Sequence, residues 1–277
     1  MKFNRDCKSF PGVYACDIMI SEDYNDCEEC KFYEKISKKI LIIKLGAIGD
    51  IIRTTPILPA LKKKYGSNIH ITWVVSKESE DVLKNNEQIN KILVYNEKTI
   101  LRLQQEKFDI LLSLEIAPPA THLANLVKAD EKFGYYFNED SHPSAFNEEA
   151  QTYLNIVFSN KVNKNTKKTY QEMIFEIIKL FYEKQNYLLK LNEQEKEYGK
   201  NLINEEKLIG INVGAAGRWL SKSWHSSKIL DLIKKIYKET NYKVVLLGGK
   251  KEEQLKKELK ETLEKENIKV LENNSNN

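Results

Sequence analysis

Residues 40–50 read Ile-Leu-Ile-Ile-Lys-Leu-Gly-Ala-Ile-Gly-Asp, and the rest of the chain is organised around this stretch. The apolar run at 40–43 predicts a strand of a parallel sheet, buried on both faces. Gly46 and Gly49 predict a sharp turn that also lets the backbone come close to a ligand. Asp50 then stands at the start of the next helix, beyond the carboxyl end of the strand, where open α/β sheets bind ligands. An ordinary strand–helix turn with Asp50 as its N-cap explains the same pattern.

Length and composition indicate a globular chain. Its 277 residues are enough for two domains of ordinary size, and 41% of them are hydrophobic. The net charge of +4 comes from interleaved lysines and glutamates, so no nucleic-acid partner is expected. No apolar run approaches the roughly 20 residues of a membrane span, and the first residues lack the apolar segment of a signal peptide. We therefore expect a cytoplasmic protein with reduced cysteines.

All four cysteines, Cys7, Cys16, Cys27 and Cys30, fall within the first 30 residues. The two-residue gap between Cys27 and Cys30 lets both sulfurs reach one ion, and Cys7 and Cys16 complete a four-thiolate set. Thiolates select zinc or an iron–sulfur cluster. We favour a structural metal that staples a leader too small to have its own core over a redox role. Paired disulfides are a third alternative, which needs an oxidising compartment.

From residue 38 predicted strands alternate with predicted helices. Strands are expected at 40–44, 69–75, 92–95, 108–114 and 132–136, and helices at 51–65, 79–85, 99–105 and 118–127. Two prolines limit the 51–65 helix to a start near residue 56 or a kinked course. Residues 138–168 are predicted as an irregular loop and crossover, and 170–182 as a helix. This βαβα order predicts a doubly wound, mostly parallel sheet.

After a predicted linker the pattern restarts. Strands are expected at 208–213, 243–247 and 268–271, and helices from 226 or 227 to 237 and at 251–265. The predicted organisation is a leader at 1–37, a Rossmann-like domain at 38–184, a linker at 185–207 and a partial Rossmann-like domain at 208–277. Two similar domains with a cleft between them are expected.

Several of these motifs together resemble glycosyltransferase family 9, the ADP-heptose:lipopolysaccharide heptosyltransferases. The resemblance rests on residues 40–56 and 71–74 in the first half, and on 210–215, 221–224 and 244–249 in the second. It covers roughly 38–272, and the cysteine-bearing leader is similar to one seen on a subset of such proteins.

The resemblance implies a two-domain GT-B fold and inverting sugar transfer that needs no catalytic metal or cofactor. Asp50 matches the family's catalytic aspartate, and Lys222 matches the lysine that meets the donor diphosphate. Gly214, Ala215 and Ser221 lie on the same loop as Lys222. The implied partners are a nucleotide-sugar donor of the ADP-heptose type and a lipid-linked glycan acceptor. Such an acceptor places the enzyme at the inner face of the membrane.

Other residues allow two interpretations. Arg53 and Thr54, with Gly46 and Gly49, are predicted to face an anionic acceptor, although Arg53 and Thr54 also suit the first turn of a helix. Without the resemblance, Lys222 is an ordinary solvated lysine. Two tryptophans near it, Trp219 and Trp224, suit either stacking on a sugar or packing in a core. His122 and His142 lack metal-ligand spacing and are expected to be structural.

The family pattern is not complete in this sequence. A His in the final third helps to hold the donor in family members, and the only His after residue 142 is His225. A doubly wound donor domain has about five or six strands, and three are predicted here, so weak nucleotide-sugar binding by residues 1–277 is expected. A non-catalytic remnant or binding protein is one alternative. A Rossmann-type oxidoreductase is another, disfavoured because the first turn lacks the third glycine of the dinucleotide fingerprint.

Overall fold

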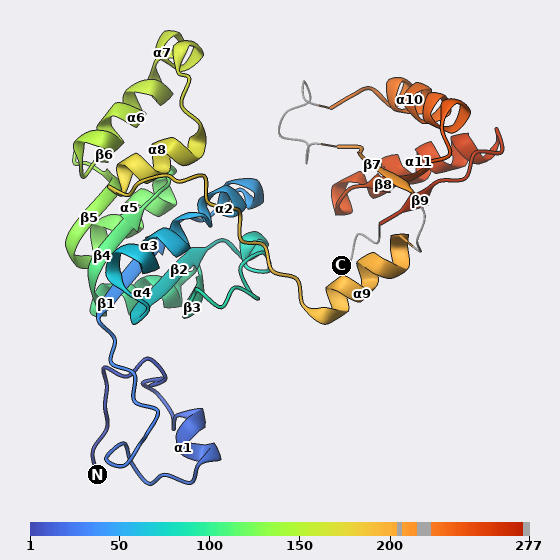
Figure 1. The fold of residues 1–277 in the computed structure, drawn as a ribbon. Coiled ribbons are helices and arrows are strands. Elements are labelled where there is room, and N and C mark those ends of the chain that lie inside the picture. Colours follow the sequence, from blue (N-terminus) through green and yellow to red (C-terminus); the bar gives the residue numbers. More distant parts are fainter. Residues whose placement is uncertain (204–206, 215–222, 274–277) are drawn as a thin grey trace. The chain divides into compact units, whose positions relative to one another are not determined.

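The computed structural model describes residues 1–203, 207–214 and 223–273 (Figure 1). The chain folds into two compact units, Met1–Lys190 and Leu191–Asn277. The first contains the cysteine-bearing leader, residues 1–37, and a six-stranded sheet, and the second contains a three-stranded sheet. All strand pairs in both sheets are parallel except one at an edge of the first sheet.

The first sheet is built around the stretch that opened the sequence analysis. Its strands are β1 (Lys38–Ile43), β2 (Ile69–Val75), β3 (Lys91–Val94), β4 (Lys107–Ser113), β5 (Lys128–Phe137) and β6 (Pro143–Ala145). They lie in the order β3-β2-β1-β4-β5-β6, with β6 antiparallel to β5. Strand β1 pairs with both β2 and β4, and its residues from Ile40 to Ile43 have no exposed surface. The predicted strand buried on both faces is confirmed.

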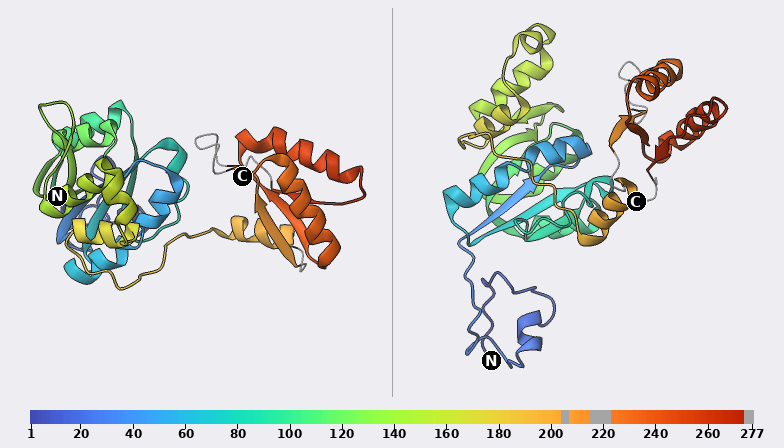
Figure 2. Two further views of the ribbon diagram at one scale, coloured as in Figure 1. Left: turned by 90° about the horizontal axis from the view of Figure 1, so that it is seen from above. Right: turned by 45° about the vertical axis from the view of Figure 1, so that its right-hand side comes forward.

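Helices cover both faces of this sheet, as two views of the ribbon show (Figure 2). The helices are α2 (Ile48–Thr54), α3 (Ile57–Tyr65), α4 (Glu97–Gln105), α5 (Pro118–Leu126), α6 (Glu148–Phe158), α7 (Asn160–Asn165) and α8 (Tyr170–Ile177). Side chains along a strand point alternately to opposite faces. Ile40 and Ile42 accordingly pack with α2, α3, α6 and α8, whereas Leu41 and Ile43 pack with α4 and α5. The predicted doubly wound α/β unit is confirmed here.

Three local predictions in this unit need correction. The segment predicted as one helix at 51–65 forms two helices, α2 and α3; the predicted start near residue 56 is confirmed, because Pro56 is the N-cap of α3. The helix predicted at 79–85 is wrong: only a short 3₁₀ turn, η1 (Lys77–Ser79), forms, and Asn86 bonds locally to the amide of Gln88. The irregular loop predicted at 138–168 is also wrong, since it holds β6, α6 and α7. Helix α6 buries only Ala150 and Leu154, too few to give a clear helical pattern.

The leader has little regular structure. It contains one short helix, α1 (Asp17–Ser21), and an isolated bridge between Cys7 and Lys35. Backbone bonds from Lys8 N to Glu34 O and from Ile36 N to Asp6 O, both 2.8 Å, hold its two ends together. Cys7 is the only apolar residue of the leader that is buried. The leader therefore has no hydrophobic core of its own.

The second unit contains a smaller sheet. Its elements are α9 (Glu193–Ile203), β7 (Leu208–Asn212), α10 (Ser226–Glu239), β8 (Lys243–Leu247), η3 (Lys250–Glu252), α11 (Glu253–Glu264) and β9 (Leu271–Glu272). The strand order β7-β8-β9 confirms that the three strands lie side by side. In the described residues, the buried apolar side chains of α10 and α11 belong to one cluster on one face, with Val244 and Leu246 of β8. Strand β9 is shorter than the predicted 268–271, because Ile268 and Val270 are buried without joining the ladder.

None of the helices in the described part of the chain is suited to crossing a membrane. The longest of those described, α10, has 14 residues, and its polar face carries several lysines. A membrane span needs about 20 mostly apolar residues.

Candidate functional site

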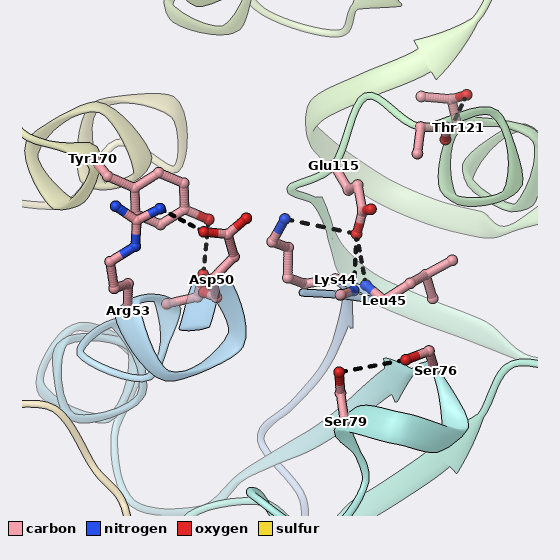
Figure 3. A network of polar contacts seen from close by, with 12 residues as sticks. Lys44, Leu45, Asp50, Arg53, Ser76, Ser79, Glu115, Thr121 and Tyr170 are labelled. Carbon is pink, nitrogen blue, oxygen red and sulfur yellow. Dashed lines mark hydrogen bonds and ion pairs between the residues drawn. The ribbon is translucent and has the colours of Figure 1, made fainter. Parts of the chain in front are cut away.

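Polar side chains gather at the carboxyl edge of the first sheet, where β1, β2 and β4 end (Figure 3). Lys44 directly follows β1, and Glu115 lies two residues after β4. Oε2 of Glu115 accepts hydrogen bonds from the amides of Leu45, at 2.8 Å, and Gly46, at 3.3 Å, and lies 3.6 Å from Nζ of Lys44. The carboxylate therefore fixes the turn after β1 and balances a buried cation.

Asp50 lies in the first turn of α2. The N-cap of this helix is Ala47, so the alternative in which Asp50 caps the helix is wrong. The Asp50 carboxylate accepts a hydrogen bond from the guanidinium of Arg53, one turn further along. The two side chains remain 36% and 45% exposed, respectively. Asp50 is thus an oriented carboxylate that a molecule at this edge of the sheet can reach.

Tyr170 of α8 brings a distant part of the chain to this helix. The Arg53 guanidinium lies 4.3 Å from the centroid of the Tyr170 ring. The Tyr170 hydroxyl is 3.0 Å from Oγ1 of Thr54, which also donates to the carbonyl oxygen of Asp50. Thr54 is fully buried, so it positions Tyr170 and α2 within the protein. Figure 3 shows Asp50, Arg53 and Tyr170 side by side.

Two tyrosines respond to the charge of Asp50. Burial, and to a smaller extent the Asp50 carboxylate, raises the pKa of Tyr153 on α6. Burial also raises the pKa of Tyr170, and Asp50 adds to the shift, while the hydrogen bond with Thr54 opposes it. Both hydroxyls are therefore neutral at pH 7.

Gly46 and Gly49 differ from the prediction in one respect. Neither has the positive φ that would require glycine for a sharp turn. A Cβ atom at Gly46 would lie 3.9 Å from Oγ of Ser76 and 4.0 Å from Oγ of Ser79, and one at Gly49 would meet nothing within 4 Å. The glycines therefore leave open space beside the turn, which agrees with close approach of a ligand but not with a conformational need.

Two buried hydroxyls near this cluster lack partners in the described part of the chain. They belong to Ser113, at the end of β4, and Tyr135, on β5. The Tyr135 ring lies 6.2 Å from that of Tyr153, and burial raises its pKa. Gly134, which precedes Tyr135 on β5, pairs with Ser113 of β4 and has a φ of +95°. A Cβ atom at this glycine would lie 1.8 Å from the carbonyl oxygen of Ser113.

The corresponding turn of the second unit follows β7. Gly214 donates a 3.3 Å hydrogen bond from its amide to Oδ1 of Asn212. A Cβ atom there would come within 2.4 Å of Cγ of Glu252, so a larger residue at this position would force the Glu252 side chain to move. Of the other residues predicted to bind the donor, Ala215, Ser221 and Lys222 lie outside the described residues.

The four cysteines are free, and all of them line one small cavity in the leader. In the described residues, no group of three or more His, Cys, Asp or Glu side chains is arranged to hold a metal ion. The four-thiolate metal set therefore stays a prediction.

Sequence reasoning missed several residues of this site, above all Lys44, Glu115, Tyr153 and Tyr170. Lys44 and Glu115 carried a usable signal, because each lies at the carboxyl end of a predicted strand. The tyrosines carried none, because only the packing of α6 and α8 over α2 brings them to Asp50.

Two mostly parallel α/β units are what proteins of the GT-B class are built from, and polar residues gather where the strands of the first sheet end. The model of glycosyltransferase family 9 (heptosyltransferase) matches residues 97–273. The chain therefore belongs to glycosyltransferase family 9.

Individual relatives agree with this assignment. Over 227 residues the chain is 24% identical to lipopolysaccharide heptosyltransferase 1 of Campylobacter coli, and the match covers 76% of this chain and 64% of that protein. The chain thus spans less than two thirds of the length of this relative.

Solved structures show the same fold. A family 9 glycosyltransferase from Veillonella parvula matches with a TM-score of 0.65 and 19% identity, covering 86% of this chain and 70% of that one. The ADP-heptose LPS heptosyltransferase II of E. coli matches with a TM-score of 0.60 and 18% identity, covering 86% and 73%.

Proposed function

We propose that this chain transfers a sugar, a heptose, from a nucleotide-sugar donor to a lipopolysaccharide core or a related surface glycan. Membership of family 9 supports this, as does the similarity to a Campylobacter coli protein that is named as a lipopolysaccharide heptosyltransferase. A lipid-linked acceptor would place the reaction at the cytoplasmic face of the membrane.

The observation that carries the proposal is the position of Asp50. It is a reachable carboxylate at the carboxyl edge of a doubly wound sheet, where ligands of such folds bind. Arg53 orients the carboxylate from one side, and the neutral ring of Tyr170 lies against that guanidinium. Such a group can accept a proton from a bound hydroxyl.

The proposed step is a single displacement. As the acceptor hydroxyl loses its proton to Asp50, its oxygen forms a bond to the anomeric carbon of the donor. The bond between that carbon and the diphosphate oxygen breaks, and its electron pair leaves with the nucleoside diphosphate. Attack from the side opposite the leaving group inverts the anomeric configuration.

The remaining assignments follow from the resemblance to the family. The backbone after β7, at Gly214 and Ala215, together with Ser221 and Lys222, would stabilise the charge of the leaving diphosphate. The open space at Gly46 and Gly49 would admit the acceptor, and Arg53 would attract its anionic groups. Thr54 would contribute from within, by holding Tyr170 in place.

Asp50→Asn tests the proposal, because an amide of the same shape cannot take up the proton. We expect nucleoside diphosphate release from ADP-heptose, in the presence of heptose-deficient lipopolysaccharide, to fall by about 10²–10⁴-fold. Asp130→Asn is the matched control, since the ion pair of Asp130 with Lys107 is exposed and lies at the start of its strand. Thermal unfolding of both variants should match that of the wild type. Turnover of Asp50→Asn within about threefold of wild type would remove Asp50 as the base.

A further inference from the structure

We propose that the leader binds a single zinc ion through Cys7, Cys16, Cys27 and Cys30. The first support is their common location. Cysteines that are as much as 23 positions apart in sequence line the same cavity, together with mostly apolar side chains.

The chemistry of the four side chains favours a single ion. Four thiolates are a common closed ligand set for structural zinc, with Zn–S bonds of about 2.3 Å. In the described residues the four thiols line one cavity without yet being gathered around one point, so zinc binding would turn them toward a common centre. Each thiol would bind as a thiolate and release its proton, so binding should weaken as the pH falls.

Backbone hydrogen bonds already hold three of the cysteines at fixed points. Cys7 lies where the leader's two ends pair, beside the bond from Lys8 N to Glu34 O. The carbonyl of Cys16 begins α1 by accepting a 3.0 Å bond from Ile20 N. Cys27 N donates to Lys2 O at 2.8 Å, which ties the Cys27–Cys30 turn to the start of the chain.

Asp26 lines the same cavity but is occupied by the backbone. Its Oδ1 accepts from the amide of Glu28 at 2.8 Å, and its Oδ2 accepts from the amide of Lys2 at 3.2 Å. Asp26 therefore shapes the turn that presents Cys27 and Cys30, and it is not expected to be a ligand.

The leader also needs such an ion. Val13 is 85% exposed and Ile20 67% exposed, and α1 buries none of its side chains. A segment without a core gains its folding free energy from a structural metal in many small domains. The leader joins the amino edge of the sheet, through Ser37 N to Asn68 O at 2.9 Å, whereas Asp50 lies beyond the carboxyl end of β1. The zinc should therefore order the leader and leave the geometry around Asp50 unchanged.

The test measures metal in the purified full chain by inductively coupled plasma mass spectrometry. We expect about one zinc per chain, and less than about a tenth of that in the double variant Cys27→Ser, Cys30→Ser. Glu34→Gln is the matched control and should keep its zinc, because among the described residues the Glu34 side chain pairs only with Lys8 at the surface of the leader. Zinc retained in the double variant, zinc lost from Glu34→Gln, or iron and sulfide in place of zinc would each overturn the proposal.

A second measurement covers the case in which the double variant does not fold. Zinc is removed from the wild-type chain with a chelator, and hydrogen exchange is followed by mass spectrometry. Amides of residues 1–37 should exchange at least about tenfold faster without zinc, while peptides from β1 and α2 stay unchanged. Re-addition of zinc should restore the original protection. Unchanged exchange throughout the leader would overturn the proposal.

Discussion

The strands β1 and β7 begin from similar sequences and reach different environments. Each is a short apolar run followed by a glycine-bearing turn. In β1 every residue from Ile40 to Ile43 is fully buried, because the strand has a neighbour on each side and helices on both faces. In β7 no residue is fully buried, because its only described neighbour is β8.

The difference shows that the burial of a strand is determined by its neighbours as much as by its own residues. Both runs have the apolar pattern of a parallel strand, and both are parallel. Among the described residues, β1 has more covering elements than β7, whereas β7 also contains Gly210 and Asn212. The first unit should therefore respond to small changes in its core more strongly than the second, and four predictions examine this.

The largest effect is expected at Gly134. Gly134→Ala places a methyl group 1.8 Å from Ser113 O at a φ of +95°, so it should lower the free energy of unfolding of the first unit by more than about 4 kcal/mol. Gly199→Ala in α9 is the control in the second unit, since nothing lies within 4 Å of its Cβ position. That change should stabilise α9 by up to about 1 kcal/mol. Urea titration followed by hydrogen exchange of peptides from each unit measures both.

A core truncation in each sheet tests the comparison directly. Ile42→Ala on β1 removes a fully buried side chain and should cost about 3–4 kcal/mol. Ile211→Ala on β7 removes a side chain that is only partly buried, and should cost about 1 kcal/mol. The same urea titration reports both values. Equal losses would mean that Ile211 is more enclosed than the described residues indicate.

The buried ion pair of the first unit should give an intermediate effect. Glu115→Gln keeps an acceptor for the amides of Leu45 and Gly46 but leaves Lys44, only 5% exposed, without its counter-charge. A loss of about 2–3 kcal/mol is expected. The double variant Lys44→Met, Glu115→Gln should recover part of the lost free energy of unfolding, because it also removes the unpaired positive charge of Lys44. A double-mutant cycle measures this coupling, and strict additivity would show that the pair does not interact.

The smallest effect is a dependence on pH that belongs to the first unit. Burial, and then the positive charges of Lys91 and Lys39, lower the pKa of His70 on β2 to about 4. The unfolded chain binds this proton near pH 6.5, so stability present above that value is lost as the pH falls towards 4. A loss of about 1–2 kcal/mol is expected between pH 7 and pH 5. His70→Gln should remove this part of the pH dependence, measured by urea titration at each pH.

Much of the fold is predictable because hydrophobic periodicity is a strong signal. The strands Ile69–Val75 and Lys243–Leu247 are predicted with their observed bounds. The signal fails where few side chains are buried. Helix α6 buries two residues, and α9 buries none among those described. For this reason the sequence pattern predicts a loop where α6 forms and a linker where α9 forms.

Only the residues of the candidate site that are neighbours in sequence are predictable. Asp50, Arg53 and the glycines follow β1 directly, and their neighbourhood can be inferred from the strand–turn–helix pattern. Tyr170 and Glu115 reach the same place through tertiary packing and strand order. No local pattern marks residues that the three-dimensional fold alone brings together.

Strand β6 has a consequence for how this molecule behaves in a crowded solution. It forms one edge of the first sheet, and exposed sheet edges can add strands from other molecules. This edge is only three residues long and begins with Pro143, which has no amide hydrogen to donate. In the described part of the chain, strand β6 pairs only with residues 135–137, and the outer edge along the rest of β5 carries the charged residues Lys128, Asp130, Glu131 and Lys132. Charged side chains on an edge strand discourage pairing with a second chain. The short hairpin and these charges should therefore discourage growth of the sheet into larger assemblies.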